Sequence, residues 1–562
     1  MKKVITVLTA SILIMIMAFS TAFSFAVTNT RENNRNENNS ENYENNGGAG
    51  EENGGSENNT DEEDENQQDR NNNSDNDSRS EEDEEENDEA DTGDVDTSWF
   101  DYKNPKTEYN ITSEAQLRGL ASLVNEEQPL WKPTRVESFE GVTFTLTKDI
   151  KLTWEWTPIG SDSSVSFAGT FDGDGHTISG VDISAGETNT GFFGYLTGEV
   201  RNLTLKGTIE STSGDCGGIV GELDSAGRIT ECVSDIDVSA RSKTGGIAGN
   251  NNGGTITDSI NKGRVKGTYK VGGVVGENWG GTVERCGNEG AVSSSVRGVA
   301  TFGTGGVAGR SVASDAVVSE CYNIGPINSA TEATGGVVGY TNAEHSTVIN
   351  SYNTGDIKIK KIDEKKEFSE AWAGGVVGAV GTDGVVISNC YGAGDISGAD
   401  VTGGVIGTYI ADDDARVETY IENNYYLNEY CDSGIGDNNG SGPAEVQKCA
   451  SGVTGGSLSG MASALSISYM RDSSGLYGGK GYPVLRWQEP LSSEDQSYID
   501  GVSMDVQRKL DNYLINNTDA SNKGGIILSI FNPDNYLTDA LLMYSESVDE
   551  NQQEQDDEEN AE

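Results

Sequence analysis

The sequence has few histidines, prolines and basic residues, and these scarcities exclude several classes of function. It has 2 histidines and 9 prolines in 562 residues, and 38 lysines and arginines stand against 92 aspartates and glutamates. Neither His176 nor His345 belongs to an HExxH pair, so the usual zinc peptidase site is excluded. A net charge of -54 argues against nucleic acid or an anionic membrane surface as a partner. We expect no cofactor and no resident metal.

Long apolar runs are equally scarce, and the clearest one lies at the N-terminus. Two lysines precede the apolar run from Val4 to Phe19, and the small residues Ser24 and Ala26 suit cleavage by signal peptidase after Ala26. We interpret residues 1–26 as the signal peptide of a secreted or cell-surface protein, with no membrane span after cleavage. An uncleaved signal anchor stays as the alternative, because Val4 to Val27 is nearly long enough to span a bilayer.

Residues 27–98 contain almost no apolar side chains and consist mainly of Asn, Glu, Asp and Ser, including the acidic run from Glu81 to Asp91. Such a segment cannot bury enough surface to offset the chain entropy lost on folding, so we predict that it is disordered. It is interpreted either as a stalk extended by its own charge or as a solubilising tail.

Glycine is abundant, with 73 residues, and much of it lies in one recurring motif. The sequence GGIVG at Gly217 to Gly221 returns six times in closely similar form, with starts at Gly245, Gly272, Gly305, Gly335, Gly374 and Gly403. Successive copies start 28, 27, 33, 30, 39 and 29 residues apart, and a degenerate copy, TGFFG, begins at Thr190. A unit of roughly 28 residues that recurs in this way predicts a solenoid or an array.

Each unit contains three short strand-like runs separated by turns. Three such strands cannot form a stable sheet alone, but they can form one coil of a parallel β-helix, in which each strand pairs with its counterpart in the next coil. We therefore predict an all-β fold, a parallel β-helix. The paired glycines allow a sharp turn or a close approach to the next coil where a Cβ would clash, as at Gly217, Gly218, Gly245, Gly246, Gly272 and Gly273.

Two further positions recur in step with the glycines. Asn-x-Gly turns predict a stacked ladder of asparagines, at Asn261, Asn288, Asn323 and Asn353. A second position, 14 to 16 residues after the start of the motif, holds a cysteine in four units, at Cys232, Cys286, Cys321 and Cys390. Serine fills that position at Ser259 and Ser351, which favours buried free thiols over disulfides. Cys431 and Cys449, outside this series, are the one plausible bridge.

Segments at both ends of the repeats are predicted to cap them. Ser113 begins a capping box ahead of an amphipathic helix over about residues 113–127, and strand-like runs follow from Val142. An end coil would otherwise expose an unpaired edge. We expect an N-terminal cap with helix, strands and first coil over residues 99–189, and the repeats over residues 190–430. An α/β C-terminal cap should follow over residues 431–488, and then a tail with two candidate helices and an acidic end over residues 489–562.

These residues resemble the GLUG-motif repeat proteins, which are exported bacterial proteins named for a repeated GG-hydrophobic-hydrophobic-G core. The resemblance covers about Tyr109 to Gln488 and rests on ITSEAQLRGLASLVN, WTPIG, FAGTFDGDGHTISG, the GG[IV][VAI]G repeats with their NxG turns, and GYPVLRWQ. It implies a right-handed β-helix at the cell surface or in the medium, often in adhesin-like proteins. Related repeats occur in immunoglobulin-A metallopeptidases, but that activity is not carried over because the zinc-binding pair is missing.

The most catalytic-looking cluster is Asp172, Asp174 and His176. Two carboxylates and an imidazole within five residues can hold a metal or act as acid and base, but Asp-Gly-Asp-Gly is also what a tight turn requires. We expect a structural turn. Enzymes built on β-helices gather acidic or basic residues on one sheet face over successive coils, whereas equivalent positions here mostly carry Thr, Ser, Val, Asn and Gly, so we expect no catalytic residue.

Ligand contact is expected where the repeat is interrupted. The two longest insertions, Ser293 to Thr304 and Lys358 to Ala373, both precede a GG motif and should project from one edge. The second concentrates basic and aromatic residues, namely Lys358, Lys360, Lys361, Lys365, Lys366, Phe368 and Trp372. It is interpreted either as a contact to an anionic cell-wall or host glycan, or as a solvated hairpin with Trp372 on its base. A second candidate is an intermittent aromatic stripe of Trp279, Tyr340 and Tyr409.

The sequence therefore predicts a non-catalytic adhesion or binding scaffold outside the cell, with a glycan or a protein as partner and its oligomeric state left open. A carbohydrate-active enzyme on the same fold, a polysaccharide lyase or hydrolase, is the first alternative, and a purely structural surface component is the second. An acidic pair on one sheet face near a groove would favour the enzyme. An exposed aromatic or basic patch would favour binding, and a featureless rod would favour the structural role.

Overall fold

The computed structural model describes residues 95–488 except 126–137, 186–188, 213, 296–301, 361–369, 411–418, 438–449, 467 and 473–479. The predicted signal peptide, nearly all of the acidic segment, the tail with its two candidate helices, and Cys449 lie outside the described residues.

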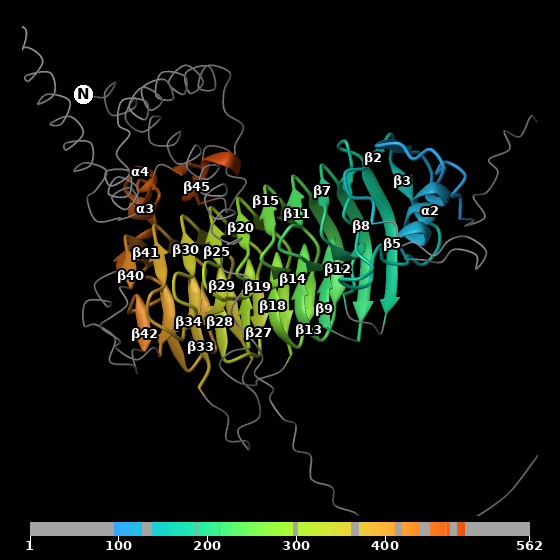
Figure 1. The fold of residues 1–562 in the computed structure, drawn as a ribbon. Helices are drawn as coiled ribbons and strands as arrows, with labels where there is room; N and C mark the ends of the chain where they lie inside the picture. Colours follow the sequence, from blue (N-terminus) through green and yellow to red (C-terminus); the bar gives the residue numbers. More distant parts are fainter. Residues whose placement is uncertain are drawn as a thin grey trace, which may run out of the picture. The chain divides into compact units, whose positions relative to one another are not determined.

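The predicted parallel β-helix is confirmed. Corresponding strands of successive coils pair in parallel, and they form four long sheets that run along the solenoid (Figure 1). The first, with 11 strands, contains β1 (Glu108–Ile111), β2 (Thr143–Leu146), β4 (Thr170–Asp172), β7 (Glu199–Arg201), β11 (Arg228–Thr230), β15 (Thr255–Thr257), β20 (Thr282–Glu284), β25 (Val317–Ser319), β30 (Thr347–Ile349), β35 (Val386–Ser388) and β40 (Tyr420–Glu422).

The second sheet has 16 strands because most coils contribute two segments to it. It contains β3 (Ile150–Lys151), β5 (Thr177–Ala185), β8 (Thr204–Ser211), β12 (Val233–Ser239), β16 (Ile260–Asn261), β17 (Val265–Gly267), β21 (Gly287–Asn288), β22 (Val292–Ser294), β26 (Tyr322–Asn323), β27 (Ile327–Ser329), β31 (Tyr352–Asn353), β32 (Ile357–Ile359), β36 (Tyr391–Gly392), β37 (Ile396–Ser397), β41 (Asn424–Leu427) and β43 (Ala450–Val453).

The GG motif joins the two remaining sheets, which we call the inbound sheet and the outbound sheet. The inbound sheet has seven strands, β9 (Gly214–Gly217), β13 (Ser242–Gly245), β18 (Tyr269–Gly272), β23 (Gly303–Gly305), β28 (Ala333–Gly335), β33 (Trp372–Gly374) and β38 (Val401–Gly403). The outbound sheet has nine, β6 (Phe193–Leu196), β10 (Val220–Leu223), β14 (Ala248–Asn252), β19 (Val275–Trp279), β24 (Ala308–Val312), β29 (Val338–Thr341), β34 (Val377–Val380), β39 (Ile406–Tyr409) and β42 (Ile435–Asp437).

The glycines of the motif are explained by the close approach of neighbouring sheets, between the inbound and outbound sheets at Gly276 and against the 16-stranded sheet at Gly246. A Cβ on Gly276, the last glycine of its copy, would lie 2.3 Å from the carbonyl carbon of Lys243 and 2.4 Å from the amide nitrogen of Thr244 in the preceding coil. A Cβ on Gly246 would lie 2.2 Å from the amide carbon of Asn261. Side chains at these positions would therefore force the sheets apart.

The asparagines and cysteines form ladders inside the solenoid. The Nδ2 atoms of Asn261, Asn288 and Asn323 donate to the Oδ1 atom of the next asparagine at 2.8, 2.7 and 2.7 Å, and the ladder ends at Asn353. The thiols at Cys232, Cys286, Cys321 and Cys390 are free, fully buried and donate to backbone carbonyls, including that of Glu284 at 3.3 Å. Serine performs the same contact, because Ser259 Oγ donates to Thr257 O at 2.7 Å.

A second amide ladder lies on the outbound sheet and was missed from the sequence. Asn251 Nδ2 donates to Asn278 Oδ1 at 2.9 Å, and Asn278 Nδ2 donates to Gly281 O at 2.9 Å and to Ser311 Oγ at 3.4 Å. Asn251, Asn278 and Ser311 are 0 % exposed. They lie six residues after the start of their own motif, a constant spacing that could have identified them.

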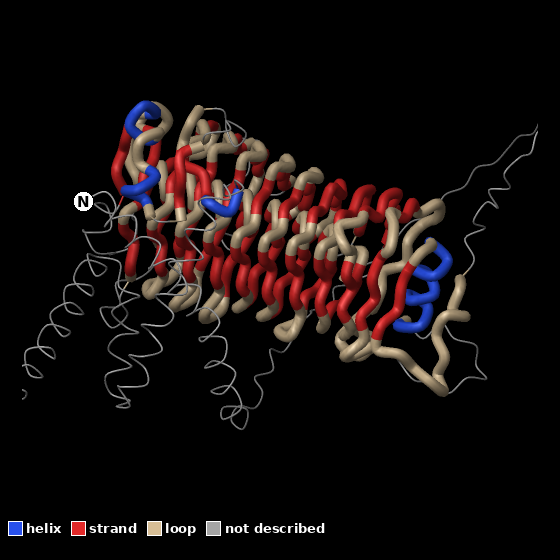
Figure 2. The backbone as a smooth tube through the Cα atoms, turned by 90° about the horizontal axis from the view of Figure 1, so that it is seen from above, coloured by secondary structure: helices blue, strands red, loops and turns tan. Residues whose placement is uncertain are grey.

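The N-terminal end of the solenoid carries the predicted helix. The helix is α2 (Glu114–Val124), seen in blue at that end of the tube (Figure 2). Ser113 Oγ caps it by accepting a hydrogen bond from the amide of Gln116 at 3.3 Å. Glu114 is buried, and its carboxylate accepts from the backbone and hydroxyl of Thr153 and from Arg118. Burial alone would raise the pKa of Glu114, but these hydrogen bonds lower the pKa overall, so the ionised carboxylate joins the helix to the segment that follows β3.

At the C-terminal end, the outbound sheet continues for one strand beyond the last recognisable GG motif of the sequence. β42 extends the outbound sheet in register with β39, and the short sequence Gly434-Ile435-Gly436 takes the place of the motif there. Beyond β43 come α3 (Gly455–Leu458), α4 (Ala462–Leu465) and the antiparallel pair β44 (Tyr469–Arg471) and β45 (Pro483–Leu485), followed by the 3-10 helix η2 (Arg486–Gln488).

The described residues from Ala462 to Gln488 pack on a column of stacked tyrosines, Tyr322, Tyr352 and Tyr391, and we call this segment the strap. The strap therefore extends back over the flank of three preceding coils instead of covering the last coil alone.

Candidate functional site

The Asp172, Asp174 and His176 cluster is a structural turn. Asp174 has a positive φ of 47°, and its amide donates to Asp172 Oδ1 at 2.9 Å. Arg201 Nε donates to Asp172 Oδ2 at 2.9 Å, whereas His176 lies 3.3 Å from Asp149 Oδ1. Burial raises the pKa of Asp172, but the hydrogen bonds it accepts lower the pKa overall. Among the described residues, no group of three or more His, Cys, Asp or Glu could hold a metal ion.

The basic insertion is only partly described. Lys358 and Lys360 are exposed, whereas Lys361, Lys365, Lys366 and Phe368 lie outside the described residues. Trp372 begins β33 and is half-buried against a small apolar cluster that joins Ala333 of the inbound sheet to Tyr340 and Ala379 of the outbound sheet. Both long insertions connect the 16-stranded sheet to the inbound sheet, from β22 to β23 and from β32 to β33, so they leave the same edge of the solenoid.

The aromatic stripe does not form. Trp279 is 49 % exposed, but Tyr340 is 4 % exposed beneath Arg310, and Tyr409 is fully buried with its hydroxyl on Asp383. The three rings lie seven, five and six residues after the start of their motifs, and therefore occupy three different positions of the outbound strands. Of the three, Trp279 alone can offer its ring to a ligand.

Charged and amide side chains of the inbound and outbound sheets meet along a line that we call the seam. The pairing register aligns Glu222, Asn250, Glu277 and Arg310 on successive outbound strands. Asp215, Lys243 and Lys270 come from successive inbound strands, where each has a positive φ. We define the seam by these seven residues together with Asn252 and Trp279.

Ion pairs connect the two sheets across the seam. Glu277, with a side chain only 4 % exposed, lies 3.6 Å from Lys243 Nζ, 2.9 Å from Lys270 Nζ and 3.0 Å from Arg310 Nη1. Lys243 Nζ also lies 3.2 Å from Asp215 Oδ2. One buried carboxylate thus holds three cations from three different coils, which fixes their positions.

The seam also contains buried polar atoms that have no hydrogen-bond partner among the described residues. These atoms are Asn250 Oδ1 and Arg310 Nε, and Asn250 as a whole is only 6 % exposed. The Nδ2 atoms of Asn250 and Asn252 both face Glu222 Oε1, at 3.5 and 3.4 Å. Unpartnered buried polar atoms are uncommon in folded proteins, so this part of the seam has unused capacity for hydrogen bonding.

Trp279 lies beside these groups. Glu277 and Trp279 flank Asn278, whose side chain belongs to the inner amide ladder, so both lie on the opposite face of β19. Trp279 pairs in register with Asn252 of the preceding coil. The seam therefore combines an exposed indole with carboxylates, amides and a guanidinium.

The carboxyl groups of the seam lack the arrangement that a glycosidase requires. Burial raises the pKa of Asp215, which Lys243 partly opposes, and burial followed by the charge of Asp215 raises the pKa of Glu222. A carboxyl with a raised pKa is what a glycosidase uses as general acid, but that reaction also requires a second, free carboxylate. Glu277, the remaining acid of the seam, is buried and bonded to three cations, so the arrangement suits binding better than acid-base catalysis.

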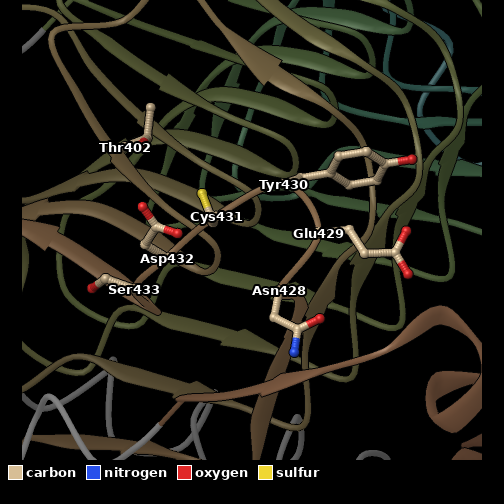
Figure 3. Close-up of a pocket in the computed structure, with 7 residues that line it drawn as sticks. All are labelled: Thr402, Asn428, Glu429, Tyr430, Cys431, Asp432 and Ser433. Atoms are coloured by element: carbon tan, nitrogen blue, oxygen red, sulfur yellow. The ribbon is translucent and has the colours of Figure 1, made fainter.

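A pocket of about 340 Å³ lies near the C-terminal end of the solenoid, between β38 and the loop that precedes β42. It is lined by Thr402, Asn428, Glu429, Tyr430, Cys431, Asp432 and Ser433 (Figure 3). Cys431 is a free thiol, 6 % exposed, and burial raises its pKa. Neither histidine lines the pocket, so nothing there converts Cys431 to the thiolate that a nucleophile requires.

Comparisons with known proteins show little beyond these observations. No protein-family model matches the sequence, and no curated protein matches it either. Among solved structures, one of a putative immunoglobulin A1 protease from Bacteroides ovatus is similar, with 18 % sequence identity and a TM-score of 0.33. The match covers 68 % of this chain and 93 % of that chain. Within the described ranges, no helix has the length and apolar character to cross a lipid bilayer.

Proposed function

We propose that the protein is an exported, non-catalytic binding scaffold of the GLUG-motif type that contributes to adhesion at the cell surface or in the medium. The observation that carries this proposal is the seam, where an exposed tryptophan lies beside polar groups with unused hydrogen-bonding capacity. The signal-like first 26 residues and the acidic segment after them support export.

The remaining chemistry of the described chain supports a scaffold. Four of the cysteines lie in a buried ladder, the Asp172 cluster forms a turn, and His345 has a positive φ of 63° and donates its backbone amide to Gly384 O. The buried thiols and the Asp172 carboxylate are thus used in structure, and the exposed His345 does not line the seam. The seam differs because its residues change from coil to coil, whereas a purely structural column would repeat.

A carbohydrate-active enzyme stays as the second candidate, supported by the raised pKa values of Asp215 and Glu222 on neighbouring sheets. The two candidates differ in one measurement. A hydrolase would release reducing ends from a polysaccharide, and a lyase would create unsaturated ends that absorb in the ultraviolet. We expect neither product.

The experiment has two parts. Cells that produce the full chain are fractionated, and the protein is expected at the surface or in the medium. Purified residues 27–562 are then tested for saturable binding to intact bacterial cells, isolated cell walls and immobilised host glycoproteins. Cytoplasmic location or the absence of binding to all three surfaces would contradict the proposal, and release of saccharide products would favour the enzyme.

A further inference from the structure

We propose that the seam is a binding site for a neutral polysaccharide, with Trp279 stacking on a sugar ring, Asn250 Oδ1 accepting a hydrogen bond from the sugar and Arg310 Nε donating one. The inference rests on the proposed binding function, and it adds the position of the site and the chemical class of the ligand.

The first argument is the unused polar capacity. Asn250 Oδ1 is an acceptor and Arg310 Nε is a donor, and neither has a partner among the described residues. The two residues lie on β14 and β24, on either side of Glu277 on β19. Leaving buried polar groups unpaired is unfavourable, so two such atoms along one seam indicate a stretch that another molecule can complete. Asn252, two residues along the same face of β14, is exposed and bonded to Glu222 at 3.4 Å.

The second argument is the exposed indole. Trp279 is 49 % exposed, although tryptophan is a large apolar side chain that proteins mostly bury. An aromatic face beside hydrogen-bonding groups suits a ligand that has both apolar C–H faces and polar hydroxyl groups. Sugars have this combination, because their C–H groups gather on ring faces while their hydroxyl groups project outward.

The third argument is charge. The seam contains three acids, Asp215, Glu222 and Glu277, and three bases, Lys243, Lys270 and Arg310, and Glu277 contacts all three bases. Each base is therefore already neutralised by an acid of the seam, which leaves little net positive charge to attract a phosphate, sulfate or uronate group. The chain has a net charge of -54 and repels polyanions at long range. These charges favour a neutral ligand over an anionic one.

The ladder geometry favours a polymer over a single sugar. Strands of successive coils are about 4.8 Å apart, and the aligned residues Asn250, Glu277 and Arg310 come from three consecutive coils. The seam thus presents its polar groups in a row along the solenoid axis, which matches an extended chain of repeating sugars.

The test is isothermal titration calorimetry of purified residues 27–562 with four neutral hexasaccharides. Three are β-1,4-linked, of glucose, N-acetylglucosamine and xylose, and the fourth is built from mannose. Polygalacturonate is the charged comparison. We expect binding of at least one neutral hexasaccharide, and we expect Trp279→Ala to weaken it by about tenfold or more. Trp154→Ala is the matched control, because Trp154 is 59 % exposed but lies on the N-terminal cap. Its affinity should equal that of the unmodified protein.

Asn250→Ala separates a ligand role from a structural role. Asn250 Oδ1 has no partner, and Asn250 Nδ2 has only the long 3.5 Å contact with Glu222 Oε1. The substitution should therefore lower the melting temperature only slightly while the affinity falls. Two results would overturn the site while the scaffold function stands: unchanged affinity in both seam variants, or binding to cell surfaces without binding to any hexasaccharide. Binding of polygalacturonate in place of neutral sugars would overturn the ligand class.

Discussion

Tyr352 and Tyr391 stack with ring centroids 5.0 Å apart and an interplanar angle of 2°, and both hydroxyls bond to the strap. Tyr352 Oη donates to Gln488 Oε1 at 3.0 Å, and Tyr391 Oη donates to the carbonyl of Pro483. The neighbouring Tyr322 ring lies 5.6 Å from that of Trp487, whose Nε1 donates to Glu320 O at 2.9 Å. The tyrosine column is thus the surface that attaches the strap to the solenoid.

Replacing Tyr391 with alanine should detach the strap. The side chain is fully buried, so the loss of its packing should cost about 3–5 kcal/mol. We expect trypsin to cleave at Lys480 and Arg486 much faster in Tyr391→Ala than in the unmodified protein. Mass spectrometry of the released fragments measures the two rates. Tyr102→Ala, a change at a tyrosine 36 % exposed, is the control and should be cleaved at the original rate. Equal cleavage in both variants would show that the column does not hold the strap.

The repeat architecture could be predicted because each ladder is encoded locally. A coil's Asn-x-Gly turn and its Cys or Ser position recur at nearly fixed distances from the glycines, and a solenoid converts equal spacing into stacking. The same fixed distances also show which side chains cannot stack. The offset of seven for Trp279, against five for Tyr340, already places these two rings at different strand positions.

The strap and the seam could not be predicted in the same way. Tyrosine follows the cysteine or serine position at Tyr322, Tyr352 and Tyr391, but only the folded chain shows that a segment about 100 residues later covers these rings. The seam depends on two sheets approaching each other at the third glycine of the motif, a contact between successive coils. Such contacts depend on tertiary geometry that a single sequence does not specify.

The asparagine ladder predicts a sharp difference between two exchanges. Asn288 is buried, accepts from Asn261 at 2.8 Å and donates to Asn323 at 2.7 Å. Asn288→Ala leaves the Asn323 Oδ1 atom without that donor and should cost roughly 1–3 kcal/mol. Asn328→Ala, at a half-buried position of β27, should change stability by less than about 0.5 kcal/mol. The midpoints of urea unfolding measure the stability of both variants. Similar midpoints for the two variants would mean that the ladder does not stabilise the fold.

The close approach of the inbound and outbound sheets predicts which glycines can be replaced. In Gly276→Ala the new Cβ meets backbone atoms at 2.3 and 2.4 Å, so one sheet must shift, at a cost of about 3 kcal/mol or more. In Gly214→Ala the nearest heavy atom lies 3.5 Å away, which is an ordinary contact. Thermal melts followed by circular dichroism should show a lower melting temperature for the first variant and little change for the second. A tolerated Gly276→Ala would refute this account of the motif.

The buried thiols predict a loss of stability in alkaline solution. Burial raises the pKa values of Cys216, Cys232 and Cys390 to about 12, against a usual value of 9.0. Above pH 9 the unfolded chain releases these protons while the folded chain keeps them, so rising pH favours unfolding. The contribution is fully present below pH 9 and is lost progressively as the pH rises toward 12.

Urea unfolding at pH 8, 9.5 and 10.5 tests this, with the Cys216→Ser, Cys232→Ser and Cys390→Ser triple variant as control. Serine does not ionise in this range, and it already occupies the position equivalent to Cys232 and Cys390 at Ser259 and Ser351. Thr244 pairs in register with Cys216, so a hydroxyl is accepted at that position too. The triple variant should therefore lose less stability than the original protein between pH 8 and 9.5. Above that range the buried tyrosines, Tyr391 and Tyr469, add a similar dependence, because burial raises their pKa values as well. Parallel loss of stability in both proteins up to pH 9.5 would show that the thiols do not cause the effect.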